Sequence, residues 1–214
     1  MYAVKEVFYT LQGEGARAGR AAVFLRFAGC NLWTGHAHTR DRGPGGCSRW
    51  CDTDFVGTDG DGGGRFPDAR SLAERAASRW PGASVGARPY VVCTGGEPLL
   101  QLDAPLVRAL HDQGFEVAVE TNGTLPVPSG VDWLCVSPKA GGALVVSQGD
   151  ELKLVVPQDS VDPGDFEALG FTHWFLQPRD GPEKAAHTAW AVRYCLSHPR
   201  WRLSVQVHKL VGIP

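Results

Sequence analysis

Three cysteines stand in or beside loops in the first quarter of the chain, at Cys30, Cys47 and Cys51. The other cysteines lie within apolar stretches and are expected to be small buried hydrophobes: Cys93, Cys135 and Cys195. Loop thiolates can hold a structural zinc ion, form a redox pair, or bind an iron–sulfur cluster. The first question is which of these chemistries the surrounding residues favour.

Each use of the three thiols requires a different number of ligands or a different cysteine spacing. A structural zinc site closes with four ligands, and His36 or His38 in the same loop would supply the fourth. A redox pair usually has two intervening residues, but Cys47 and Cys51 are separated by the three residues 48–50, so this use ranks last. An iron–sulfur cubane held by three thiolates keeps one iron open for chemistry. The cysteines alone leave zinc and iron open.

A second candidate motif, CTGGEP at 93–98, closes an apolar stretch. Its glycines allow the backbone to approach a ligand closely, and Glu97 could take an ammonium group. The same residues also suit a tight strand-to-helix connection, with Pro98 in the first helical turn. Together with three loop cysteines upstream, the motif indicates a site more strongly than it does alone.

Short apolar runs alternate with segments of helical spacing. Runs of strand length lie at 21–27, 90–93, 115–120, 133–137, 152–156, 174–177 and 202–207, and helical spacing appears within 99–110 and 186–194. This alternation predicts βαβ units and a mainly parallel sheet. The Gly-rich and polar stretches 35–46 and 57–66 are predicted to be long loops.

Polar residues follow the ends of these apolar runs. In a parallel sheet, catalytic and ligand-binding residues gather at the carboxyl ends of the strands. They are Arg26, Thr94 to Glu97, Glu120 to Asn122, Ser137 to Lys139, Gln177 to Asp180, and His208. Any one of them could be an ordinary polar turn. Six such groups together predict a shared site at one edge of the sheet.

Composition narrows the class of protein. A formal net charge of −2 over 214 residues gives no reason to expect nucleic acid or an anionic membrane as a partner. Six unevenly spaced cysteines do not form the framework of a disulfide-rich secreted domain. The chain shows neither a leader pattern nor an apolar run approaching the ~18 residues of a membrane span. We therefore expect a cytoplasmic protein with a single domain over residues 1–214.

The cysteine cluster ahead of TGGEP resembles the radical S-adenosylmethionine (SAM) superfamily. More narrowly, the chain resembles the 7-carboxy-7-deazaguanine synthase family almost from end to end. The motifs that carry the resemblance are LQGEG (11–15), FLRFAGCNLW (24–33), CDTDFVGTDG (51–60), CTGGEPLLQ (93–101), ETNGT (120–124), VSPK (136–139) and HKLVGIP (208–214).

The resemblance implies a fold and a reaction. The fold would be an incomplete, modified (β/α) TIM-like barrel of the radical SAM type, with a cluster-binding loop at about residues 30–66. The reaction would contract the ring of 6-carboxy-5,6,7,8-tetrahydropterin to 7-carboxy-7-deazaguanine and release ammonia, as in queuosine-type biosynthesis. The alternatives are a zinc-stapled binding domain without chemistry, or another radical SAM activity such as an activating enzyme.

The resemblance also assigns residues and partners. It gives a 4Fe–4S cluster to Cys30, Cys47 and Cys51, and Mg²⁺ to Thr53. Substrate contacts would come from Leu11, Gln12, Gly13, Glu14, Arg26, Thr94, Glu120, His208 and the carboxylate of Pro214. SAM contacts would come from Gly96, Glu97, Asn122, Ser137, Pro138, Lys139, Gln177, Pro178, Arg179 and Asp180. A flavodoxin or ferredoxin would supply electrons, and the protein would be a homodimer.

The cysteine spacing departs from the superfamily's usual CX3CX2C pattern. Sixteen residues separate Cys30 from Cys47, and three separate Cys47 from Cys51. The resembled family includes members with a long first insertion. The extra residue in the second gap changes the local turn that must aim both thiols at one cluster, although Trp50 keeps an aromatic residue before the last cysteine.

Overall fold

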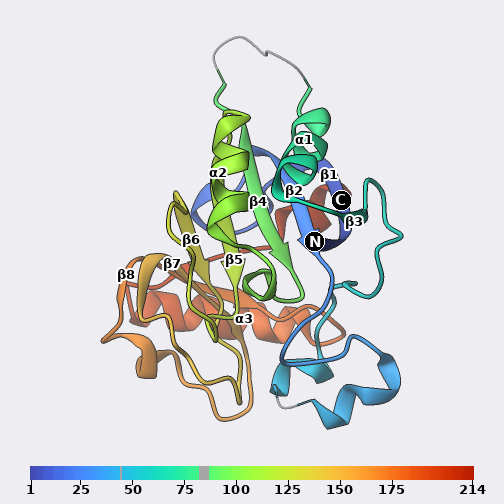
Figure 1. The fold of residues 1–214 in the computed structure, drawn as a ribbon. Coiled ribbons are helices and arrows are strands. Elements are labelled where there is room, and N and C mark those ends of the chain that lie inside the picture. The colour runs from blue at the N-terminus through green and yellow to red at the C-terminus, as the bar shows by residue number, and fades with distance from the viewer. Residues whose placement is uncertain (44, 82–86) are drawn as a thin grey trace.

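The computed structural model describes residues 1–43, 45–81 and 87–214. In these residues, nine strands form one sheet in the order β3-β1-β2-β4-β5-β6-β7-β8-β9 (Figure 1). The strands are β1 (Tyr2–Leu11), β2 (Ala21–Phe27), β3 (Gly64–Phe66), β4 (Tyr90–Gly95), β5 (Glu116–Thr121), β6 (Trp133–Val136), β7 (Gln148–Val156), β8 (Gly170–Pro178) and β9 (Arg202–Leu203).

The sheet is parallel from β2 to β9, and only β1 and β3 run antiparallel to their neighbours. The α-helices are α1 (Ala69–Arg79), α2 (Ala104–Asp112), α3 (Lys184–Ser197) and the short α4 (Val207–Val211). The expected α/β fold with a mainly parallel sheet is confirmed. None of the helices in the described ranges is both long and apolar enough to cross a membrane.

The central strands β4 and β5 bury both of their faces, which explains their nearly continuous apolar sequences. Val91 and Cys93 of β4 belong to the core beneath α1 and α2. The alternate residues Tyr90 and Val92 face the inside of the curved sheet, where they pack with Ala118. The last strands repeat this arrangement against α3, which packs on β8 (Figure 1).

Side-chain caps fix where the helices α1 and α2 begin. The Asp68 carboxylate accepts the Ser71 N–H at the start of α1, and Asp103 accepts the Leu106 N–H at the start of α2. Asp103 also accepts the hydroxyl of Tyr2 at 2.8 Å, so the cap of α2 holds the first strand as well.

The prediction of a strand over residues 202–207 is wrong in its second half. The run 202–207 forms a strand only at Arg202–Leu203, and α4 begins at Val207. The reason lies in tertiary contacts of Ser204, whose hydroxyl donates to Gln177 and accepts the Gly15 N–H at 3.0 Å. His208 therefore lies on α4 and not at the end of a strand.

The two expected loops contain short regular segments. A 3₁₀ helix occupies Ala37–Arg42 within the loop at 35–46, and β3 closes the loop at 57–66. Residue 44, which belongs to the first of these loops, lies outside the described residues. The strand β1, which the apolar runs did not reveal, pairs with β2 from Val4↔Phe27 to Leu11↔Ala21.

Candidate functional site

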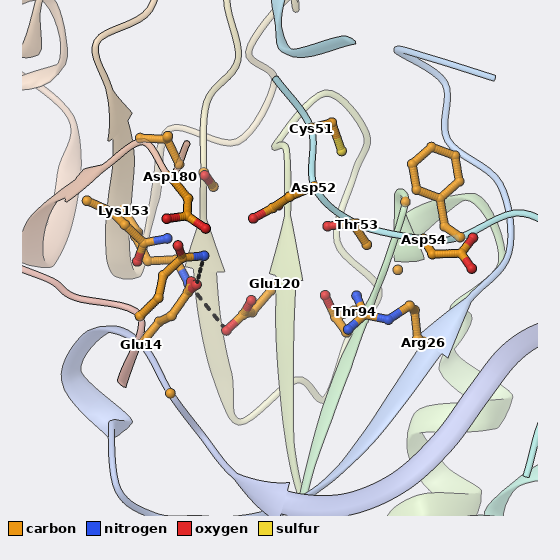
Figure 2. Close-up of a pocket in the computed structure, with 18 of the residues that line it drawn as sticks. Glu14, Arg26, Cys51, Asp52, Thr53, Asp54, Thr94, Glu120, Lys153 and Asp180 are labelled. Carbon is orange, nitrogen blue, oxygen red and sulfur yellow. Dashed lines mark hydrogen bonds and ion pairs between the residues drawn. The ribbon is translucent and has the colours of Figure 1, made fainter. Parts of the chain in front are cut away.

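A cavity of about 360 Å³ lies at the carboxyl ends of the parallel strands. This volume is in the range of small-molecule and cofactor sites. Its wall combines the end of β1, the ends of β2, β4, β5 and β8, the loops around residues 30–33 and 50–55, and the segment 206–214. Figure 2 shows how side chains from these separate elements point toward one another.

The structure brings most of the expected site residues to this one cavity. All expected substrate contacts line it: Leu11, Gln12, Gly13, Glu14, Arg26, Thr94, Glu120, His208 and Pro214. So do most of the expected SAM contacts: Gly96, Asn122, Ser137, Lys139, Gln177, Pro178, Arg179 and Asp180. Glu97 and Pro138 are absent from the lining.

Glu97 lies beneath the cavity wall and is fully buried. Its carboxylate accepts the Thr121 hydroxyl at 2.6 Å, the Asn122 N–H at 2.7 Å and the Leu99 N–H at 3.0 Å. Burial raises the pKa of this carboxyl, whereas these donors favour its ionised form. The side chain thus joins the end of β4 to the end of β5, and it is not directed at a ligand.

The glycines before Glu97 allow two backbones to approach closely. A Cβ atom at Gly96 would lie 2.3 Å from the carbonyl oxygen of Gly29 and 2.7 Å from Cβ of Cys30. The Glu97 N–H also donates to the Gly29 carbonyl, at 3.0 Å. The end of β4 and the loop that carries the first thiol are therefore held against each other.

Cys30, Cys47 and Cys51 all line the cavity, and none forms a disulfide. The 3₁₀ helix at Gly46–Arg49 accommodates the extra residue in the second gap, and the Cys51 N–H donates to the Cys47 carbonyl at 2.7 Å. Burial raises the pKa of the Cys47 thiol to about 11 and also raises that of Cys30. Metal binding must therefore displace protons from these thiols.

The three thiols fit an iron–sulfur cluster, and neither histidine of the same loop lines the cavity as a fourth zinc ligand. Within the described residues, no three side chains of the His, Cys, Asp or Glu type are grouped so as to hold one metal ion. His36 and His38 stack on each other and lie outside the cavity lining. In a cubane each thiolate binds its own iron, so the three thiols that line this cavity would leave one iron open for a ligand.

Arg26 projects into the cavity beside Thr94, its register partner on β4 (Figure 2). Its Nε donates to Glu6 Oε1 at 2.7 Å across the β1–β2 pair. Its terminal nitrogens make no hydrogen bond within the described ranges of the chain. Glu6 therefore aims the guanidinium fork, and the free end can bind a carboxylate.

Thr53 lies on the cavity wall between Asp52 and Asp54 (Figure 2). The Lys5 ammonium holds this loop from β1, 3.0 Å from Asp54 and 2.8 Å from Asp59. Hydrogen bonding to Lys5 lowers the pKa of Asp54. A patch of carboxylate and hydroxyl oxygens at this position offers the hard ligands that Mg²⁺ prefers.

Lys209 on α4 bridges two other segments of the wall. Its Nζ lies 2.5 Å from Asp52 and 2.7 Å from Asp180. Hydrogen bonds from Lys209 and Lys184 lower the pKa of Asp180 to about 2. Residues 207–211 are thereby tied to both the cysteine loop and the end of β8.

Sequence reasoning missed several residues on the cavity wall, chiefly Glu6, Lys153, Gln206 and Lys209. Lys153 carried a signal, because ELKLVV places charges at alternate positions of an otherwise apolar strand. Lys153 Nζ lies 2.6 Å from Glu14 and 3.4 Å from Glu120 (Figure 2). The others became visible only when the fold brought distant segments together.

Comparison with known proteins agrees with this geometry. No family model matches the chain. Curated proteins named 7-carboxy-7-deazaguanine synthase do match it: one from Bordetella pertussis is 62% identical, and one from Burkholderia multivorans is 57% identical. Each alignment covers 100% of this chain and 99% of the relative. The chain belongs to the 7-carboxy-7-deazaguanine synthase family.

A solved structure of this family has the same fold. The crystal structure of QueE from Escherichia coli is 26% identical to this chain and superposes with a TM-score of 0.62. The match covers 97% of this chain and 94% of that chain. The fold is thus the radical SAM type of α/β barrel, as expected from the sequence motifs.

Proposed function

We propose that this protein is a radical SAM lyase that converts 6-carboxy-5,6,7,8-tetrahydropterin into 7-carboxy-7-deazaguanine and ammonia, in a queuosine-type pathway. The observation that carries the proposal is the meeting of three unpaired thiols and a ring of charged side chains in one cavity. The names of relatives that are 57% to 62% identical over the full length support the same reaction.

Cys30, Cys47 and Cys51 would hold the 4Fe–4S cluster, with Gly96, just after β4, packed against Cys30. When bound, the cluster and SAM supply the electron and the radical that abstracts hydrogen from the substrate. The chain provides orientation and a closed environment. Ser137, Lys139 and the residues from Gln177 to Asp180, which line the same cavity, would bind SAM. Pro138 is left out of this set because it does not line the cavity, and its carbonyl accepts a hydrogen bond from Gln158.

The substrate end of the cavity offers complementary charges. The fork of Arg26 would bind the substrate carboxylate, with Mg²⁺ at Thr53 as a second cation beside it. Glu14 and Glu120 would accept N–H groups of the pterin edge. His208 packs over Gly13, where a Cβ would lie 2.1 Å from the imidazole Nδ1, and so completes this wall.

Three further features belong to the proposal. A flavodoxin or ferredoxin would supply electrons, the functional protein would be a homodimer, and it would act in the cytoplasm. They are supported by the family membership of the chain.

Anaerobic reconstitution with iron and sulfide tests the proposal. A brown protein with about four irons per chain that converts the pterin with SAM and a chemical reductant is expected, since this is the cluster that three thiolates hold. A colourless protein that binds stoichiometric zinc through the same cysteines would instead establish a structural metal site. A brown protein that cleaves SAM without converting the pterin would indicate another radical SAM activity.

A further inference from the structure

The strand β7 carries charged residues on a face where buried strands normally carry apolar ones. Its residues Leu152 and Leu154 pack into the core against α3. The alternate residues Glu151 and Lys153 point to the inside of the curved sheet, and the Lys153 side chain is only 4% exposed. A buried ammonium is strongly unfavourable unless it is paired and hydrogen-bonded.

The partners of Lys153 are two carboxylates from other parts of the chain. Its Nζ lies 2.6 Å from Glu14 Oε2, in the loop after β1, and 3.4 Å from Glu120 Oε1, on β5. Figure 2 shows the three side chains converging on the cavity from separate elements. One cation thus brings together two like charges that would otherwise repel each other.

Two glutamines complete the arrangement. Gln206 donates to Glu14 Oε1 at 3.1 Å. Gln12 donates to Glu120 Oε1 at 2.8 Å and accepts the Glu14 N–H at 3.1 Å. Glu120 Oε2 makes no hydrogen bond within the described parts of the chain and so remains an open acceptor on the cavity wall.

We propose that Lys153 is a positioning residue of this site, whose ammonium fixes the Glu14 and Glu120 carboxylates side by side as acceptors for a substrate edge that donates N–H groups. The inference rests on the proposed function and deepens it. Lys153 acts through the two carboxylates and does not itself contact the substrate. The ion pair therefore keeps Glu14 ionised when the substrate binds.

The electrostatics of the pair agree with this role. Burial disfavours the ionised form of Glu14, but attraction to Lys153 and hydrogen bonds from Lys153 and Gln206 outweigh it, so the pKa of Glu14 lies well below its usual range. Burial also opposes the charge on Lys153, whereas Glu120 and Glu14 raise its pKa. Both charges are thus maintained at neutral pH.

Other titratable groups face the same region from the surrounding strands. Glu151 lies on β7, Cys135 lies on β6 within 3.5 Å of Glu151, and His208 approaches from α4. Lys139 contributes positive charge from the loop after β6. None of these groups lies within salt-bridge distance of Glu14 or Glu120, so Lys153 is the cation whose removal should change the titration of Glu14.

The test compares Lys153→Met with Lys153→Arg in the reconstituted holoenzyme. Loss of the charge should weaken substrate binding by about 10- to 150-fold, the factor that a hydrogen bond to a charged group represents. It should also raise the pKa of Glu14, so that KM increases as the pH falls from mildly alkaline to mildly acidic. Lys153→Arg should restore most of the affinity and a flat pH profile, and SAM binding should stay unchanged in both variants.

Glu151→Gln is the matched control on the same strand. Its carboxylate accepts the Ala16 N–H at 2.9 Å, so this variant should lower the melting temperature without making KM depend on pH. A Lys153→Met enzyme that melts earlier but keeps the wild-type KM and pH profile would overturn the proposal. A Lys153→Arg enzyme with a strongly pH-dependent KM would overturn it equally, even if Lys153→Met does not fold.

A binding measurement separates this inference from the proposed reaction. The fluorescent 6-carboxypterin presents the same pyrimidine edge, and its Kd can be measured without turnover. Wild-type protein that binds 6-carboxypterin without converting the tetrahydropterin would refute the reaction alone. Equal Kd values and pH profiles for wild type and Lys153→Met would refute the role of Lys153 alone.

Discussion

Replacing Glu97 by glutamine should destabilise the protein without weakening SAM binding. The carboxylate accepts three hydrogen bonds, two on Oε1 and one from the Asn122 N–H on Oε2. A glutamine can keep its oxygen toward Thr121 and Leu99. Its NH₂ group then takes the place of Oε2, which accepts the Asn122 N–H at 2.7 Å, so two donors face each other. The variant thus loses one charge-assisted bond in a fully buried position.

The size of the effect follows from that one bond. A hydrogen bond to a charged group contributes about 1.5–3 kcal/mol. For a chain of this length, each kcal/mol shifts the melting temperature by roughly 2–4 °C. We therefore expect Glu97→Gln to melt roughly 3–12 °C lower, while the Kd for SAM changes less than about threefold.

Thermal unfolding followed by circular dichroism, together with SAM binding by calorimetry, gives both quantities. Glu74→Gln is the control, because that side chain is 52% exposed on α1 and pairs with Arg70 on the helix surface. Its melting temperature should match that of the wild type. The reasoning is refuted if Glu97→Gln melts like the wild type and binds SAM tenfold more weakly, since Glu97 would then contact the ligand.

Three other expectations follow from the site. Cys51→Ala should lose the visible absorbance of the reconstituted cluster, whereas Cys195→Ala should keep it, and a brown Cys51→Ala protein would reassign the third ligand. Thr53→Ala should weaken the dependence of turnover on Mg²⁺ while SAM binding is retained; an unchanged response would remove Thr53 from the metal site. Because its lysine partners lower the pKa of Asp180 to about 2, the pair with Lys209 should persist in mild acid. Asp180→Asn should therefore raise hydrogen exchange in α4, and equal exchange rates would contradict this.

The sequence identified the elements whose environment is uniform along their length. Residues 21–27 and 90–93 are buried or half-buried on both faces, so these apolar runs match β2 and all but the last two residues of β4. In β1 the run is broken by Lys5 and Glu6, whose partners are a loop fifty residues away and a neighbouring strand. Those partners exist only in the folded chain, and the strand was therefore missed.

The site was predicted well in position but less well in detail. Parallel strands place their ends together, so the polar groups after β4, β5 and β8 were bound to meet. The direction of a single side chain depends on its neighbours across the sheet. Glu97 follows the right strand, yet Thr121 and Asn122 on the next strand draw its carboxylate away from the cavity. Lys153 was overlooked because its two partners lie far from it in the sequence.

The contacts between the two ends of the chain have a consequence for how the protein folds. The end of β1 and the loop after it are joined to the segment 204–214 by three hydrogen bonds. The Gly15 N–H donates to the Ser204 hydroxyl, Gln206 donates to Glu14, and the Thr10 hydroxyl at the end of β1 donates to the Pro214 carbonyl at 2.9 Å. These contacts link residues 189 to 204 positions apart. During synthesis the cysteine loop therefore leaves the ribosome long before the wall that encloses it. Contacts of such high sequence separation form late and slowly, so the cavity closes as one of the last events of folding.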